Sequence, residues 1–276
     1  MRISRILGAV TLALSLAACG TSQSATSDKP AEKPADAVLK VGASPVPHAE
    51  ILKFVKDNLA PAAGLKLEIV EFTDYVQPNV QLDEGELDAN FFQHKPYLDD
   101  FNASKGTKLS FLTPVHLEPL GLYSKKITSL GALASGATVA VPNDATNLGR
   151  ALKLLADNGV VKLKDGAGTA ATERDVVENP KNLQFKPVEA AQLPRTLEDV
   201  DAAVINGNYA IEAGLKPASE ALALEKTEAN PYVNGLVVRQ GHEKDPNIVT
   251  LGKLLQDPKV KDFINQKYQG SVIPAF

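Results

Sequence analysis

The sequence predicts an α/β protein built as a two-lobed clamshell, in which each lobe is a mixed, mostly parallel sheet flanked by helices. Segments with strand-like and helix-like apolar patterns alternate over residues 38–92 and again over residues 137–205. Such alternation favours strands that run mostly parallel, with helices covering the sheet. A late strand-like segment at residues 232–239 follows the second set. We expect this strand to return to the first lobe, which places a hinge between the lobes.

The first lobe begins with a buried strand over residues 38–42, followed by Pro47, a residue that suits the first position of a helix. The helix expected at residues 48–59 repeats its apolar residues every three or four positions, so one of its faces is buried. The remaining elements of this lobe are a strand with alternating polarity at 65–72, a short helix at 78–84 and a strand at 87–92.

The second lobe repeats this pattern. Its strands are expected at 137–141, 183–188 and 202–205, and its main helix at 147–157. Gly159 follows that helix at a position where glycine commonly ends one. A last helix begins at Asp257 and Pro258, an N-cap followed by a proline at the first helical position. The lobes expected from these elements are residues 38–117 with 233–276, and residues 118–232.

The N-terminus carries the features of a secretory signal. Arg2 and Arg5 precede an apolar stretch at residues 6–17, which is too short to span a bilayer comfortably. The sequence Leu-Ala-Ala-Cys ends at Cys19, the only cysteine, and resembles the bacterial lipobox, in which cleavage precedes a cysteine that then carries palmitate-type acyl chains. We therefore expect a signal peptide at 1–18 and a lipidated, flexible tether at 19–37, rich in small and polar residues. A plain signal peptide cut near a free thiol remains the alternative.

Composition excludes several classes of function. The net charge is −4 and no run of lysine and arginine is present, so binding to nucleic acid is not expected. One cysteine permits no disulfide within the chain. The four histidines lie far apart, and neither a Gly-x-Ser-x-Gly nucleophile motif nor a phosphate-binding glycine loop is present. We expect no enzyme and no cofactor.

Candidate binding residues lie where strands end, because ligands of open α/β sheets bind beyond the carboxyl ends of the strands. The first group is the segment 140–150, where a strand stops and a helix with Asn147 and Arg150 begins. A helix N-terminus has free N–H groups, and a guanidinium grips a carboxylate at two points. This combination indicates a carboxylate site. A capped helix with Arg150 in a surface ion pair is the alternative.

Further candidates follow other strands. Phe92, His94 and Tyr97 come from the segment 90–97, whose rings are suited to an apolar slot. Phe91 and Phe92 point to opposite faces of a strand, so we expect at least one of the two in the core. The other candidates are His116, on a strand that crosses between the lobes, and Asn206 and Asn234, whose amides bind both ammonium and carboxylate groups. A structural histidine and ordinary turn chemistry are the alternatives.

Six segments resemble the methionine-binding lipoprotein family of methionine ABC importers, the NlpA-type lipoproteins. They read GASPVPHAEIL at 42–52, DYVQPN at 74–79, FQHKPY at 92–97, VPNDATNLGR at 141–150, VVENPKNL at 176–183 and PYVN at 231–234. The resemblance runs in order over nearly all of residues 38–276.

This resemblance implies a two-lobed periplasmic-binding fold with L- or D-methionine between the lobes. It implies that Arg150 holds the ligand carboxylate and that Asn147, Asn206 and Asn234 bind the polar end. It also assigns Tyr75, Phe92, His94, Tyr97 and His116 to the slot for the side chain. The implied partners are the permease and ATPase subunits of an ABC importer, together with the membrane through Cys19. We expect a monomer in the cell envelope that faces the periplasm or the cell exterior.

Three other functions remain open from the sequence. The same fold is suited to a short methionine-containing peptide or another apolar amino acid. A metal-binding surface lipoprotein would use His48, His94 and His116. An adhesive or structural lipoprotein is compatible with the tether but does not require candidate residues at so many strand ends.

Overall fold

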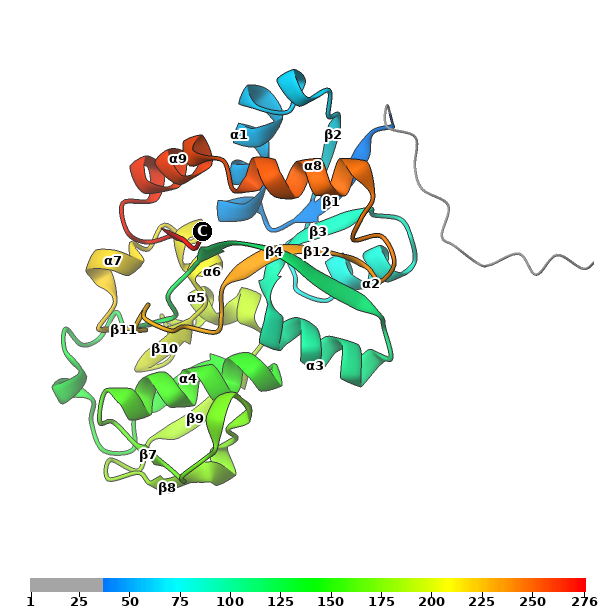
Figure 1. Ribbon diagram of the computed structural model, residues 1–276. Helices are drawn as coiled ribbons and strands as arrows, with labels where there is room; N and C mark the ends of the chain where they lie inside the picture. Colours follow the sequence, from blue (N-terminus) through cyan, green and yellow to red (C-terminus); the bar gives the residue numbers. More distant parts are fainter. Residues whose placement is uncertain (1–36) are drawn as a thin grey trace, which may run out of the picture. The chain divides into compact units, whose positions relative to one another are not determined.

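The computed structural model describes residues 37–276, which belong to one compact unit (Figure 1). Two main sheets organise this unit, one of six strands and one of five strands. The chain leaves the first sheet after β4 (Leu109–Leu117) and comes back to it with β12 (Asn234–Arg239). β4 and β12 pair with each other. The connection that leaves the first sheet and the connection that returns to it therefore join the sheet at neighbouring strands.

The first sheet has the strand order β13-β4-β12-β3-β1-β2. Its other strands are β1 (Leu39–Ala43), β2 (Leu67–Glu71), β3 (Ala89–His94) and β13 (Ile273–Pro274). The second sheet has the order β11-β5-β10-β6-β9. Its strands are β5 (Gly121–Tyr123), β6 (Thr138–Pro142), β9 (Gln184–Val188), β10 (Ala202–Ile205) and β11 (Ala223–Leu224). A separate pair is formed by β7 (Lys162–Leu163) and β8 (Val176–Glu178).

The prediction of mixed sheets flanked by helices is confirmed, but the parallel share is smaller than predicted. β1 runs parallel to β2 and β3, and β6 runs parallel to β9 and β10. The other pairings within the two main sheets are antiparallel. β4 and β12 run antiparallel because one carries the chain out of the first sheet and the other carries it back. The β-α-β units that the sequence pattern detects account only for the parallel strand pairs.

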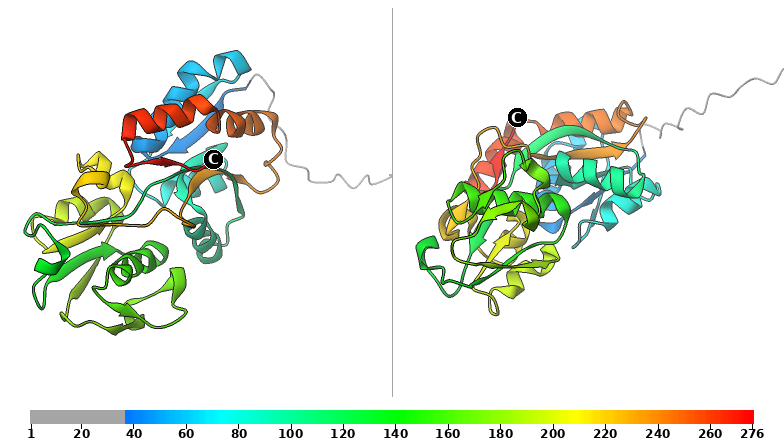
Figure 2. Two further views of the ribbon diagram at one scale, coloured as in Figure 1. Left: turned by 60° about the vertical axis from the view of Figure 1, so that its left-hand side comes forward. Right: turned by 90° about the horizontal axis from the view of Figure 1, so that it is seen from below.

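Helices cover both faces of the two sheets (Figures 1 and 2). The α-helices are α1 (Glu50–Asn58), α2 (Gln77–Asp83), α3 (Lys95–Lys105), α4 (Ala145–Asp157), α5 (Leu193–Thr196), α6 (Gly207–Glu212), α7 (Pro217–Glu220), α8 (Pro246–Leu255) and α9 (Pro258–Tyr268). A π-helical turn, η1 (Pro45–Ala49), precedes α1. Short 3-10 turns are η2 (Pro61–Ala63), η3 (Leu130–Ala132), η4 (Gly168–Ala170), η5 (Glu173–Asp175) and η6 (Ala190–Gln192).

Alternation along a single strand shows how each sheet separates two apolar layers. In β12, Leu236 and Val238 join the cluster that contains the buried faces of α1, α8 and α9, whereas Val237 joins the cluster of α2 and α3. In β6, Val139 packs with the α4 cluster and Ala140 with the cluster of α5 and α6. Successive side chains of a strand point to opposite faces, so both faces of each sheet are buried.

Most predicted elements are present with ends shifted by one to three residues. The helix predicted at 48–59 is divided between η1 and α1, and the last helix begins at Pro258 with the Asp257 side chain accepting a hydrogen bond from the N–H of Lys259. Helices α3, α5, α6, α7 and α8 were not predicted. The strand expected to cross between the lobes near His116 ends at Leu117, and a new strand begins at Gly121.

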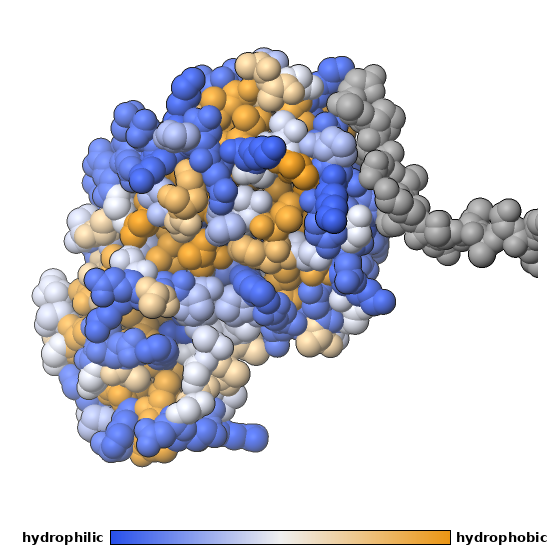
Figure 3. Space-filling view, viewed as in Figure 1, coloured by the Kyte–Doolittle hydropathy of each residue, from blue (hydrophilic) through white to orange (hydrophobic). Residues whose placement is uncertain are grey.

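The predicted signal peptide, Cys19 and nearly all of the predicted tether lie outside the described residues. Among residues 37–276, no helix combines the length and the apolar character needed to cross a membrane. In the face shown in Figure 3, hydrophilic side chains are interspersed with hydrophobic patches, both on the part built on the first sheet and on the part built on the second sheet.

Candidate functional site

A cavity of about 330 Å³, partly open to solvent, lies where residues from both sheets meet. The first sheet and its connections contribute Tyr75, Phe92, Gln93, His94, Tyr97 and Asn234 to its lining. The second sheet and its helices contribute Asn147, Arg150, Asn206, Gly207 and Asn208, and Glu118 stands on the connection between the two sheets.

The structure brings eight of the nine sequence-predicted binding residues to this cavity. They are Arg150, Asn147, Asn206, Asn234, Tyr75, Phe92, His94 and Tyr97. The ninth, His116, is fully buried and does not line the cavity, because its ring lies against Phe91 and Glu118. Its predicted place in the wall of a side-chain slot is therefore wrong for the cavity as the structure has it.

Arg150 is anchored by a carboxylate that the sequence analysis did not identify. Its Nε donates to Oε1 of Glu225 at 2.9 Å and its Nη2 to Oε2 at 2.6 Å. Nη2 also donates to the main-chain oxygen of Glu118 at 2.9 Å, and the guanidinium carbon lies 4.3 Å from the centre of the Tyr232 ring. The side chain is only 4% exposed, so the ion pair expected as an alternative exists, but it is buried.

The charge of Arg150 is fixed by this arrangement. Burial alone would lower the pKa of Arg150, but the Glu225 carboxylate outweighs burial, and the pKa is raised. Within residues 37–276, every hydrogen bond of the guanidinium uses Nε or Nη2. Nη1 is therefore the nitrogen that remains for a ligand.

The N-terminus of α4 is capped by the protein itself. Asp144 accepts a hydrogen bond from the N–H of Asn147 at 2.9 Å, and the same carboxylate accepts from the Asn147 side-chain amide at 3.0 Å. From the sequence, free N–H groups at this terminus are expected to bind a ligand carboxylate. This expectation is wrong for the N–H of Asn147, since Asp144 occupies it.

The Asn147 side chain instead joins the two sides of the cavity. Its Oδ1 accepts from Nδ2 of Asn206 at 3.0 Å and lies 3.2 Å from Nε2 of His94. Because Oδ1 can only accept, Nε2 of His94 carries the proton, and Nδ1 accepts from the N–H of Tyr97 at 3.1 Å. The pKa of His94 falls to about 3, first because of burial and second because of the nearby charge of Arg150, so the ring is neutral.

Aromatic rings form one wall of the cavity. The Tyr75 ring centre lies 5.9 Å from that of Phe92 and 5.8 Å from that of Tyr97. The Tyr97 hydroxyl donates to the main-chain oxygen of Tyr75 at 3.0 Å, and the Tyr75 hydroxyl donates to Oδ1 of Asn208 at 2.5 Å. Phe91 packs in the core cluster of α1, as the alternation of the strand predicts for one of the two neighbouring phenylalanines. These rings leave an apolar wall that is suited to a hydrocarbon or thioether chain.

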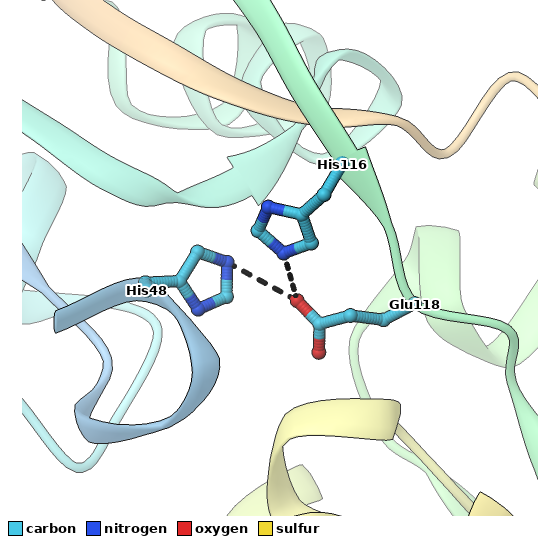
Figure 4. A group of neighbouring side chains, drawn as sticks. All are labelled: His48, His116 and Glu118. Carbon is cyan, nitrogen blue, oxygen red and sulfur yellow. Dashed lines mark hydrogen bonds and ion pairs between the residues drawn. The ribbon is translucent and has the colours of Figure 1, made fainter. Parts of the chain in front are cut away.

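His48, His116 and Glu118 form a buried cluster (Figure 4), and of these three residues Glu118 lines the cavity. Oε1 of Glu118 lies 2.7 Å from Nε2 of His116 and 3.2 Å from Nε2 of His48. Nε2 of His48 also lies 3.3 Å from Oδ1 of Asn234, another acceptor, so it donates. Burial lowers the pKa of His48 to about 4 and that of His116 to about 3. Two neutral imidazoles thus donate to one carboxylate.

This cluster is not the one that the metal alternative requires. His94 is bonded to Asn147 and is not among the residues whose ligand atoms converge, and Glu118 takes its place. The strand period of two offered a signal for Glu118, because residues 116 and 118 lie on the same face of an extended segment. The other lining residues missed from the sequence are Gln93, Gly207 and Asn208. Gln93 and Gly207 directly follow predicted residues, and Asn208 lies two positions after Asn206.

Comparisons with known proteins give the family. The sequence matches the NlpA lipoprotein family over residues 39–276. It is 40% identical over 272 residues to the D-methionine-binding lipoprotein MetQ of Escherichia coli, covering 98% of this chain and 96% of that protein. It is 38% identical over 277 residues to outer membrane lipoprotein 2 of Mannheimia haemolytica, with both chains covered completely.

Among solved structures, a nutrient-binding protein of Burkholderia cenocepacia bound to methionine is 46% identical, with a TM-score of 0.83. The match covers 86% of this chain and all of that chain. The family match extends over nearly all of the described residues, and the two-lobed fold is shared. This chain belongs to the NlpA lipoprotein family.

Proposed function

We propose that this protein is the extracytoplasmic substrate-binding lipoprotein of an ABC importer and that its ligand is methionine, in the L form, the D form or both. The observation that carries the proposal is the cavity itself, in which a buried guanidinium faces a wall of aromatic rings. The printed names of the Escherichia coli relative and of the Burkholderia cenocepacia structure, which refer to D-methionine and to methionine, support the same ligand.

In this proposal the ligand lies with its polar end toward the second sheet. Nη1 of Arg150 binds the carboxylate, and the amides of Asn147, Asn206 and Asn234 complete the polar contacts. Tyr75, Phe92, His94 and Tyr97 surround the thioether chain, for which contacts between sulfur and aromatic rings are favourable by about 0.3–1.5 kcal/mol each. His116 acts from behind the cavity, through Glu118.

Binding involves capture and no chemical step. We assign residues 38–117 with 233–276 to one lobe and residues 118–232 to the other. The lobes close around the zwitterion, because a buried charge requires a partner and closure brings partners from both sides. The closed form then docks on the permease, and the ATPase drives uptake.

The cellular setting follows from the N-terminal sequence. We propose that signal residues 1–18 are removed, that Cys19 is acylated, and that the tether holds a monomer at the cell envelope. Cleavage before Cys19 leaves the binding domain outside the cytoplasm, where a nutrient must be captured for import. Mass spectrometry of the N-terminal peptide from purified membranes would detect the acyl chains.

Isothermal titration calorimetry of the purified protein, freed of bound ligand by unfolding and refolding, tests the ligand. L-methionine, D-methionine, leucine and a Gly-Met dipeptide are the titrants. The proposal expects saturable, stoichiometric binding of at least one methionine enantiomer and weaker binding of leucine. Tighter binding of the dipeptide than of either enantiomer would instead favour the alternative that the sequence leaves open, a peptide-binding protein of the same fold.

A further inference from the structure

We propose that Glu118 supplies the negative charge that binds the ammonium group of the ligand, and that His48 and His116 hold its carboxylate in position. This inference rests on the proposed function, because it assumes that the ligand is an amino acid. It assigns to the ligand ammonium a charged partner in addition to the asparagine amides.

The charges of the cavity lining support this role. Of the residues that line the cavity, Arg150 supplies a guanidinium, which is always charged, and Glu118 supplies a carboxyl group, the acidic side chain of the lining. The remaining lining residues are uncharged, since the pKa of His94 lies far below neutrality. A lining with one cation and one anion is complementary to a zwitterion.

The two charged groups differ in how the protein balances them. Arg150 is already paired, because Glu225 engages it at two points from outside the cavity lining. The carboxylate of Glu118 has no cation bonded to it: among the described residues, its ion-pair partners are only His48 and His116, whose rings are neutral. The charge of Arg150 lowers the pKa of Glu118, but the guanidinium bonds the main-chain oxygen of Glu118 and is itself paired with Glu225. A buried carboxylate held by neutral donors still lacks a counter-charge, and an ammonium group would supply it.

The carboxylate of Glu118 is held firmly enough to act as a fixed site. Oε1 accepts from both imidazoles, and the N–H of Asn208 on the opposite side of the cavity favours the ionised form, although burial raises the pKa of Glu118. Gly207 lies so close that a Cβ added there would stand 2.7 Å from Cβ of Glu118. The residue is 5% exposed and therefore cannot move away into solvent.

The anion and the cation are also close enough for one amino acid to reach both. Nη2 of Arg150 donates to the main-chain oxygen of Glu118 at 2.9 Å, so the guanidinium lies beside the backbone that carries the carboxylate. The ammonium and the carboxylate of an α-amino acid are attached to the same carbon. A ligand anchored by Nη1 of Arg150 can therefore present its ammonium to Glu118.

The test compares two ligands on two variants. Methionine has both charges, whereas γ-methylthiobutyrate has the same chain and carboxylate but no ammonium. Calorimetry at pH 7 in the presence of EDTA gives the affinity ratio of the two ligands for the wild type, for Glu118→Gln and for Glu225→Gln. The Glu225 variant is the matched control, because Glu225 lies outside the cavity lining and acts through Arg150, whose proposed partner is the carboxylate common to both ligands.

We expect the wild type to prefer methionine by at least about 30-fold, the lower bound for a buried charge pair. Glu118→Gln should weaken the affinity for methionine by at least about 30-fold and change the affinity for γ-methylthiobutyrate by no more than about threefold, so that the preference for methionine is lost. Glu225→Gln should keep the preference for methionine. Equal weakening of both ligands by Glu118→Gln would overturn the proposal in favour of a purely structural role. Unchanged methionine affinity, or methionine binding that EDTA abolishes, would overturn it as well.

The wild type also tests the proposal without any variant. If Glu118→Gln does not fold, the wild type alone decides, because a preference for methionine below about threefold contradicts a charged partner for the ammonium. If the wild type does not bind methionine at all, the proposed function is refuted. If the wild type binds methionine and γ-methylthiobutyrate equally well, only the role of Glu118 is refuted.

Discussion

His94 and Asn147 approach to 3.2 Å although they belong to elements of different sheets. His94 ends β3 of the first sheet, and Asn147 lies in the first turn of α4, which packs on the second sheet. Asn147 in turn accepts from Asn206, the residue before α6. One amide oxygen thus links three strand or helix ends around the cavity, so the polar side of the site depends on the relative position of the two sheets.

Replacement of Asn147 by alanine removes this link. Nε2 of His94 and Nδ2 of Asn206 lose their acceptor, and a buried polar group left unpaired costs about 1–3 kcal/mol. We expect Asn147→Ala to weaken methionine binding by about 10-fold or more in calorimetry. Asn158→Ala, at the other end of α4, is the control, since among the described residues the Asn158 side chain bonds only to the main-chain oxygen of Leu154. Equal affinities of the two variants would remove Asn147 from the site.

Replacement of Arg150 by alanine removes the only cation of the cavity lining and leaves Glu225 without its partner. We expect Arg150→Ala to lose about 2–5 kcal/mol of methionine affinity, the cost of truncating a buried charge pair. Arg150→Lys should also bind weakly, because an ammonium cannot engage Glu225 side-on and present another nitrogen to the ligand. Lys153→Ala, three residues along the same helix in an exposed pair with Asp157, should bind as the wild type does.

The neutral state of His94 makes stability depend on pH. The pKa of His94 is lowered from 6.5 to about 3 in the folded protein, so below pH 6.5 the unfolded chain takes up a proton that the folded chain does not. The free energy of unfolding therefore falls as the pH decreases from 6.5, by about 1.4 kcal/mol per pH unit for this residue. His48 and His116 act in the same direction.

Urea denaturation at pH 7 and pH 5 measures this effect. We expect His94→Gln to lose about 2 kcal/mol less stability than the wild type between these two values, because the variant lacks the proton uptake of His94 on unfolding. The variant should still lose some stability, since His48 and His116 remain. An identical loss in both proteins would mean that the folded protein accommodates a charged His94.

A close approach fixes the position of α4. A Cβ on Gly149 would stand 2.4 Å from the main-chain oxygen of Thr169, which cannot rotate away. We expect Gly149→Ala to destabilise the protein by about 1–3 kcal/mol through overpacking. Gly131→Ala is the matched control, because nothing lies within 4 Å of a Cβ at that position. Thermal unfolding of both variants measures the difference, and a similar melting temperature for the two would contradict the close packing of α4.

The fold could be predicted from the sequence where a local signal and an apolar period coincide. Asp257 and Pro258 predict the start of α9, and the structure has it there. Asp245 and Pro246 carry a similar signal and begin α8, but the polar residues around them weaken the pattern. The sequence also indicates strands without their partners. The antiparallel pairing of β12 with β3 and β4 depends on long-range contacts, which alternation along one segment does not encode.

The candidate site could be predicted in part for the same reason. Residues at strand ends, such as Asn206 and His94, were found because the carboxyl ends of strands converge. Glu225 was not found, since it is 75 residues away from Arg150 and lies outside any strand-to-helix turn. The position of His116 behind the cavity was missed because a strand pattern gives the face of a residue and not its depth.

Identification of the small molecule that copurifies with the protein is the sharpest test of methionine as the ligand. The protein is purified without added amino acids and unfolded, and the released ligand is identified by mass spectrometry with chiral chromatography. The account predicts methionine, in the L or the D form, at close to one equivalent per chain. Recovery of a different amino acid, or of a metal ion with no organic ligand, in comparable amount would contradict it.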